Sequence, residues 1–223
     1  MTKRKQESYR KLIITCICTF IALLFPYPLT AKTFEYKGNG KELANKDGRA
    51  DSMLVCQLRH KGISFSHNNS VTLLCTGQEK FDDLFKAIDQ ARSSIHLEYF
   101  NFRNDSINDE LIRHLEKKVK QGVEVRAIFD GFGNASNNQP MKKSTLRAIR
   151  KKGIEIYEFK PIEFPWIHDI FNRDHRKIVI IDGKIAYTGG MNVADYYIKG
   201  TKVVGSWHDM HCRIEGDEVN TLQ

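Results

Sequence analysis

Three residues at a fixed spacing give the strongest indication of chemistry in this chain. His175, Lys177 and Asp182 form the pattern His-x-Lys-x-x-x-x-Asp, and a Gly-Gly-x-Asn run ending at Asn192 follows it. An imidazole can attack phosphorus, while an ammonium and a side-chain amide can stabilise charge on the non-bridging oxygens. The pattern therefore predicts a site that acts on a phosphodiester, and it occurs once in the chain.

A predicted β-hairpin carries the pattern. Residues 178–181 are apolar and β-branched, Asp182-Gly183 is a dipeptide favoured in tight turns, and residues 184–188 alternate as a return strand. Asp182 counts among the candidate catalytic residues because it completes the motif. Its place at the turn nevertheless favours a role in local structure over contact with substrate.

The other groups are expected to converge at one end of this hairpin. His175 and Lys177 are two positions apart, so their side chains leave the same face of an extended chain. Gly189-Gly190 lets the backbone approach a ligand, and Asn192 is expected to open a helix whose first N–H groups can meet an anion. His175 is the candidate nucleophile, and Lys177 and Asn192 are the candidate phosphate-binding residues. A bare His-x-Lys is usually a solvated strand edge, but the added Gly-Gly-x-Asn favours catalysis.

Strand and helix patterns alternate along residues 70–223. Helices or strands are predicted, in chain order, over residues 81–91, 95–99, 107–119, 123–130, 146–149 and 154–159. This alternation argues for an α/β fold with a mostly parallel sheet covered by helices on both faces. Glu98 and Asp130 fall late in predicted strands, where the ligand sites of such sheets gather, although structural roles are favoured for both.

The first 31 residues have the pattern of a secretory signal peptide or a membrane anchor. Residues 1–11 are basic and residues 12–25 form an apolar run. This run is short for a spanning helix, which takes about twenty residues, so a signal is favoured over an uncleaved anchor. Either one predicts a protein that is membrane-associated or exported to the cell envelope. Residues 32–69 are polar and are interpreted as an irregular linker with a weak first strand.

Charge and cysteine content set limits on partners. Half of the formal net charge of +8 lies in the first eleven residues, and the mildly basic remainder suits anionic lipid and nucleic acid equally. An exported chain would allow a disulfide between Cys56 and Cys75, with at least one thiol, such as that of Cys212, left over. No His/Cys spacing suggests zinc, and neither a metal nor a cofactor is expected.

The motif and its surroundings resemble the phospholipase D superfamily, and in particular the N-terminal catalytic half of bacterial cardiolipin synthases. The similarity extends over residues 94–100, 122–133, 172–177 and 207–216. The resemblance implies a phospholipase D-like fold in which two such motifs meet, one histidine attacking phosphorus and the other protonating the leaving oxygen. His175 would be the nucleophile or its acid partner.

The resemblance also assigns a role to Asp209 in the Trp-x-Asp-x-His stretch. It matches a position where an acidic residue accepts a hydrogen bond from the motif histidine, which fixes the tautomer and steadies the imidazolium. On spacing alone, the less favoured alternative for Asp209 is a charge on a surface strand.

The chain departs from the family because it holds one motif where a synthase of this type holds two in a much longer polypeptide. A second HxKxxxxD half would come from a missing C-terminal half or from a homodimer. Residues 218–223 have the pattern of the first turn of a helix, which is typical of a truncated chain.

The expected reaction is phosphatidyl transfer between alcohols at a membrane surface. His175 would attack an anionic, phosphatidylglycerol-like lipid, and a second alcohol would collect the phosphatidyl group to give cardiolipin; water as acceptor would make the protein a phospholipase. The alternatives are a homodimeric phosphodiesterase acting on nucleic acid and an inactive fragment that binds lipid or a partner. The aromatic residues at 164–168 are interpreted either as a lipid-facing lip or as packing beneath their loop.

Overall fold

The computed structural model describes residues 49–63, 66, 68–162, 171–203 and 205–223. The chain divides into two units, Met1–Ile63 and Ser64–Gln223. In the first unit, α2 (Arg49–His60) is a helix of 12 residues inside the segment that was expected to be irregular. The expected leader and the aromatic residues at 164–168 lie outside the described residues. In the part of the chain that is described, no helix has the length and apolar character needed to cross a bilayer.

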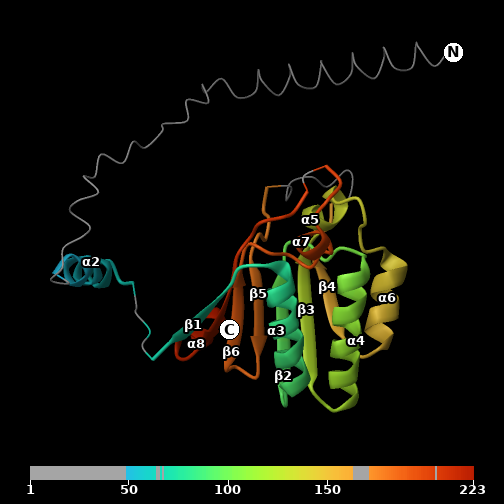
Figure 1. The fold of residues 1–223 in the computed structure, drawn as a ribbon. Coiled ribbons are helices and arrows are strands. Elements are labelled where there is room, and N and C mark those ends of the chain that lie inside the picture. Colours follow the sequence, from blue (N-terminus) through green and yellow to red (C-terminus); the bar gives the residue numbers. More distant parts are fainter. Residues whose placement is uncertain (1–48, 64–65, 67, 163–170, 204) are drawn as a thin grey trace, which may run out of the picture. The chain divides into compact units, whose positions relative to one another are not determined.

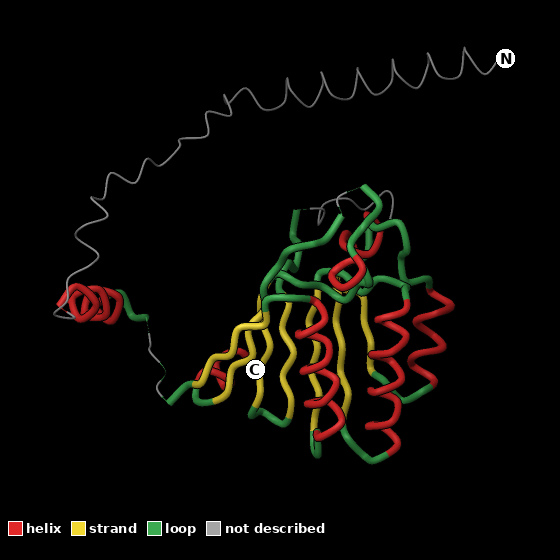
Figure 2. The backbone as a smooth tube through the Cα atoms, viewed as in Figure 1, coloured by secondary structure: helices red, strands yellow, loops and turns green. Residues whose placement is uncertain are grey.

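A seven-stranded sheet organises the described part of the second unit (Figures 1 and 2). The strands are β1 (Ser70–Leu74), β2 (Ser94–Tyr99), β3 (Glu124–Asp130), β4 (Glu155–Phe159), β5 (Lys177–Ile181), β6 (Ile185–Gly189) and β7 (His211–Glu215). Their order across the sheet is β1-β7-β6-β5-β2-β3-β4, so β5, which begins with Lys177, lies at the centre. The predicted strands and the hairpin of the motif are confirmed.

The sheet is mixed, which corrects the expectation of a mostly parallel one. Strands β2, β3 and β4 pair in parallel, whereas β5 pairs antiparallel with both β2 and β6, and β7 pairs antiparallel with β6 and β1. Helices α4 (Ser106–Lys120) and α6 (Lys143–Lys151) carry the chain back between parallel strands. The tight turn after β5 instead permits only an antiparallel neighbour, because a parallel one needs a long crossover. The α/β class itself is confirmed.

Helices cover one face of the sheet. Helix α3 (Gly77–Gln90) packs there with α4 and α6 (Figure 1). The side chains of Leu84 and Ile88 recur at helical spacing on α3 and are fully buried, as is that of Ile95 on β2. Burial of this apolar stripe fixes the position of α3 on the sheet. Two short helices, α5 (Gly131–Ser136) and α7 (Tyr196–Lys199), lie at the end of the sheet where β3 finishes (Figure 1).

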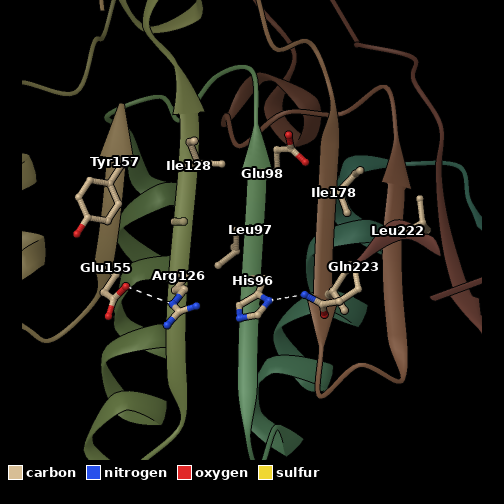
Figure 3. Close-up of a pocket in the computed structure, with 12 residues that line it drawn as sticks. His96, Leu97, Glu98, Arg126, Ile128, Glu155, Tyr157, Ile178, Leu222 and Gln223 are labelled. Carbon is tan, nitrogen blue, oxygen red and sulfur yellow. Dashed lines mark hydrogen bonds and ion pairs between the residues drawn. The ribbon is translucent and has the colours of Figure 1, made fainter. Parts of the chain in front are cut away.

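The opposite face is covered only in part by the described residues. The short helix α8 (Glu218–Leu222) packs on β5, β6 and β7. Over β2, β3 and β4, the side chains of His96, Arg126 and Tyr157 face outward (Figure 3), and Tyr157 is 58% exposed. Among the described residues, no helix covers this part of the face, which differs from the expectation of helices on both faces. Polar residues alternate with apolar ones along these strands, which suits a sheet with one solvated face.

Candidate active site

His175 lies in the loop immediately before β5 with its side chain exposed. Its ring packs against the ring of Phe100, with 4.7 Å between the ring centroids, and lines an open hollow of about 560 Å³. The imidazole makes no hydrogen bond with any residue that the structure describes. Its nitrogens are therefore available to a ligand that enters the hollow.

Lys177 lies beneath His175 as the first residue of β5 and is only 4% exposed. Its ammonium donates a hydrogen bond of 2.6 Å to the carbonyl oxygen of His175. Burial lowers the pKa of Lys177, and the carboxylates of Asp174 and Asp209 offset part of that shift. Lys177 therefore restrains the backbone of His175, the candidate nucleophile, and places a positive charge close to it.

Asn192 is buried but does not open a helix, which corrects the expectation. The next helix, α7, begins at Tyr196, because Val193 pairs with Phe102 in an isolated β-bridge that keeps the chain extended. The side-chain oxygen of Asn192 accepts a hydrogen bond of 3.1 Å from the backbone N–H of Asn101. Its side-chain nitrogen donates to the hydroxyl of Tyr197 over 3.3 Å, which leaves a second amide hydrogen for a ligand.

The Gly189-Gly190 pair lets another part of the chain come close. A Cβ on Gly190 would overlap Oδ1 of Asp209, and a Cβ on Gly189 would lie 2.7 Å from Nδ1 of His211. The absent Cβ atoms thus make room for the segment around β7 rather than only for a ligand. Asp209 accepts a hydrogen bond of 2.7 Å from the N–H of Met210, and it makes none with His175 among the described residues.

Asp182 lies at the other end of β5 from Lys177. Its carboxylate accepts hydrogen bonds of 2.7 to 3.0 Å from the backbone N–H groups of Arg92, Ser93 and Ser94 and from the Ser93 hydroxyl. Partial burial alone would raise its pKa, but these donors lower it to about 2. Asp182 therefore ties the hairpin turn to the start of β2 and does not reach the hollow beside His175.

Two buried residues that the sequence did not single out lie behind the motif. Lys80 on α3 and His211 on β7 are both completely buried. Neither ring nitrogen of His211 has a hydrogen-bond partner among the described residues, and burial, with the charges of Lys80 and Lys177, lowers its pKa to about 2. The position of Lys80 next to Phe81, on the stripe shared with Leu84, was a pattern that could have revealed it.

The carboxyl groups of Glu98 and Asp174 lie together on the rim of the hollow, although the sequence favoured only a structural role for Glu98. Burial, followed by the nearby carboxylate of Asp174, raises the pKa of Glu98 to about 7. Arg176 bridges the pair, with a nitrogen 2.7 Å from Glu98 and another 3.4 Å from Asp174. Glu98 and Asp174 line the same hollow as His175, so this pair lies beside the candidate nucleophile.

A separate hollow of about 350 Å³ lies on the uncovered face of the sheet (Figure 3). It is lined by side chains such as His96, Tyr157 and Leu222, and His175 is not among them. Among the described residues, no three His, Cys, Asp or Glu side chains are grouped so that they could hold a metal ion. Cys56, Cys75 and Cys212 are free thiols.

The sequence of the chain is similar to those of known proteins. Residues 84–202 match the family model described as "Cardiolipin synthase, PLD-like domain". Cardiolipin synthase 2 of Staphylococcus epidermidis is 38% identical over 188 residues, which cover 84% of this chain and 37% of that protein. Cardiolipin synthase of Staphylococcus aureus strain N315 is 40% identical over 172 residues, or 77% of this chain and 34% of that protein. The chain thus spans little more than a third of the length of these relatives.

Solved structures show the same fold. Phosphatidylserine synthase of Haemophilus influenzae superposes with a TM-score of 0.54 at 15% identity, over 68% of this chain and 34% of that one. NucT from Helicobacter pylori superposes with a TM-score of 0.50 at 18% identity, over 70% of this chain and 89% of that one. The family model and the staphylococcal relatives show more than a shared fold: the chain belongs to the cardiolipin synthase family of phospholipase D-like proteins.

Proposed function

We propose that this chain supplies one catalytic half of a phosphatidyltransferase that works through a phosphohistidine at His175. The observation that carries the proposal is an exposed imidazole whose backbone is held by the buried ammonium of Lys177. The names of the staphylococcal relatives support cardiolipin synthesis as the reaction. Because the chain spans only part of their length, the second half comes from a further segment or from another copy of the chain.

The reaction proceeds in two displacements. A ring nitrogen of His175 attacks the phosphorus of a phosphatidylglycerol-like lipid, a P–N bond forms, and the P–O bond to the departing glycerol breaks. The histidine of the second half gives its proton to the leaving oxygen. A hydroxyl of another lipid then attacks phosphorus, returns a proton to that histidine and breaks the P–N bond. The products are cardiolipin and glycerol, and no oxidant or reductant is needed.

The surrounding groups stabilise the charge that develops on phosphorus. Lys177 supplies a positive charge that is already in place, and the free amide hydrogen of Asn192 can donate to a non-bridging oxygen. The carboxylate of Asp209 acts on the ammonium of Lys177 and favours its charged form. Since the substrate is a lipid, the enzyme acts at a membrane surface, and residues 1–31 are the candidate signal or anchor that brings it there.

Covalent trapping tests the proposal. The full chain is incubated with phosphatidylglycerol vesicles labelled in the phosphate and quenched in base, and the label on protein is measured. We expect label on the wild type and on His60→Ala, which changes an exposed histidine on α2, but none on His175→Ala. Label that persists in His175→Ala contradicts the proposal, and so does a wild type that stays unlabelled both alone and after a second catalytic half is added.

The products identify the acceptor. Cardiolipin indicates an alcohol, and phosphatidic acid indicates water, which would make the enzyme a phospholipase. Cleavage of DNA by a dimer that gives no lipid product would favour the homodimeric nuclease instead.

A further inference from the structure

Lys80 is a completely buried lysine in the first turn of α3. Its ammonium lies 3.9 Å from the centre of the Phe81 ring and 5.1 Å from that of Tyr99. It donates one hydrogen bond, of 3.3 Å, to the backbone carbonyl oxygen of Asn192. The ammonium is thus enclosed by two aromatic faces and one carbonyl, and that carbonyl belongs to a residue of the motif.

A lysine in this place is unfavourable for the fold alone. No carboxylate among the described residues lies within ion-pair distance of Lys80, and burial lowers its pKa well below the usual range although the charge of Asp209 opposes the shift. An apolar side chain of similar length would pack between Phe81 and Tyr99 without that desolvation. A buried amine that costs stability is more readily explained by the site that it contacts.

The buried groups around Lys80 carry more positive than negative charge. Lys177 and Lys80 are both buried and both act on the ring of His211, which has no hydrogen-bond partner in the described part of the chain. Asp209 is the carboxylate that acts on the two lysines from within the site, although Asp174 on the rim also acts on Lys177. A bound phosphate group would supply the negative charge that this arrangement leaves unmatched.

We propose that Lys80 is a positioning residue of the phosphate site, which holds Asn192 through its backbone carbonyl and places a second positive charge behind Lys177. The inference deepens the proposed function and rests on it for the identity of the phosphate group. Lys80 does not touch the substrate; it acts through Asn192 and through its field. It lies on α3, about a hundred residues before the motif, so it joins the site only through the fold.

The chain provides a matched control in Lys118 on α4. Lys118 is 5% exposed, and its ammonium donates a hydrogen bond of 3.1 Å to the backbone carbonyl of Asp89, in a hollow that neither Lys177 nor Asn192 lines. Lys118→Met and Lys80→Met remove the same kind of buried bond. A difference between them therefore reports on the site and not on the loss of a buried lysine as such.

The test measures the dissociation constant of inorganic phosphate for the full chain by calorimetry. We expect Lys80→Met and Lys80→Gln to raise it at least about tenfold, because both remove a buried positive charge that acts on the phosphate, and Lys118→Met to leave it within about twofold. The glutamine variant retains an N–H donor, so it isolates the charge. Equal effects of the Lys80 and Lys118 variants, unchanged affinity in Lys80→Met, or wild-type affinity in Lys80→Gln overturn the proposal.

A spectroscopic measurement on the wild type does not depend on any variant folding like the parent. With ¹⁵N- and ¹³C-labelled lysine, phosphate should shift the side-chain Nζ signal of Lys80 and leave that of Lys118 in place. If phosphate moves neither signal, Lys80 takes no part in the site. Failure of the covalent-trapping experiment with lipid would count against the proposed function alone, because neither phosphate measurement requires turnover.

Discussion

The ammonium of Lys177 lies 2.6 Å from the carbonyl oxygen of His175, so the cation of the motif restrains the backbone of the candidate nucleophile. The two residues differ sharply in environment, since the imidazole is exposed and the lysine is 4% exposed. Such a division suits a covalent mechanism: the nucleophile must reach the substrate, while the charge that stabilises the phosphoryl oxygens acts more strongly where water is excluded.

Lys177→Met should therefore remove both the restraint and the charge. We expect the rate of phosphohistidine formation to fall by about 10² to 10³, as for the loss of one preorganised group that stabilises the transition state. The measurement is the initial rate of covalent labelling. Lys184→Met is the control, because Lys184 is an exposed lysine in the turn at the far end of β5. A Lys177→Met variant that is labelled as fast as this control would contradict the role of Lys177.

Asp182→Asn should weaken the fold without removing the chemistry. The carboxylate binds the N–H groups at the start of β2, and we expect a loss of about 2 kcal/mol in the free energy of unfolding at neutral pH. The pKa of Asp182 in the folded state is about 2, below the usual 3.8, so its contribution is present above about pH 4 and disappears as the pH falls toward 2.

Urea unfolding of both proteins between pH 2.5 and pH 7 measures this contribution of Asp182. The gap between wild type and Asp182→Asn should close on the acid side. A gap that stays constant with pH, or loss of covalent labelling in a folded variant, would show that Asp182 has another role.

The hairpin of the motif could be predicted because its determinants are local. An apolar β-branched run, a turn dipeptide and a return strand specify β5 and β6 without reference to the rest of the chain. The place of Asp182 at the turn favoured a local role for the same reason, but its hydrogen-bond partners around Ser93 could not be identified from the sequence. The helices α3 and α4 also followed from the spacing of their buried faces.

The predictions that were wrong concern features that depend on contacts between distant segments of the chain. The chain stays extended beyond Asn192 because Val193 pairs with Phe102, some ninety residues earlier, and no local pattern predicts that bridge. Strand directions also escaped prediction, since alternation of elements does not reveal that β5 reverses against β2. Lys80 was overlooked because a lysine on a helix is normally exposed, and only the assembled fold shows this one to be buried.

Glu98→Gln should change how stability depends on pH. Burial and the neighbouring Asp174 raise the pKa of Glu98 to about 7, compared with the usual 4.5, so the folded state binds this proton more tightly than the unfolded chain. The contribution of Glu98 is thus fully present below about pH 4.5 and is lost as the pH rises through 7. Glutamine imitates the protonated form, so the variant should gain stability relative to wild type between pH 5 and pH 8.

Melting temperatures across this pH range provide the measurement for Glu98. Glu155→Gln is the control, since Glu155 is an exposed glutamate on the same face of the sheet (Figure 3). Curves for wild type and Glu98→Gln that run parallel from pH 5 to pH 8 would show that Glu98 does not titrate in this range.

Gly190→Ala should disrupt the site by steric conflict alone. A Cβ there would overlap the carboxylate of Asp209, which is the far end of a flexible side chain, so this carboxylate must turn away from the Gly189-Gly190 backbone. We expect a loss of about 1 kcal/mol or less in the free energy of unfolding but at least a tenfold slower covalent labelling. Gly183→Ala is the contrasting change: Gly183 has a φ of +62° and nothing within 4 Å of a new Cβ.

Alanine at Gly183 therefore carries backbone strain of about 1 kcal/mol but no clash, and it lies at the turn remote from His175. Both glycine variants should be less stable than wild type, yet only Gly190→Ala should slow labelling measured well below its melting temperature. If Gly183→Ala slows labelling as much, the loss follows general stability and not the displacement of Asp209. If Gly190→Ala is labelled at the wild-type rate, close approach of Asp209 to the Gly189-Gly190 backbone is not required for attack on phosphorus.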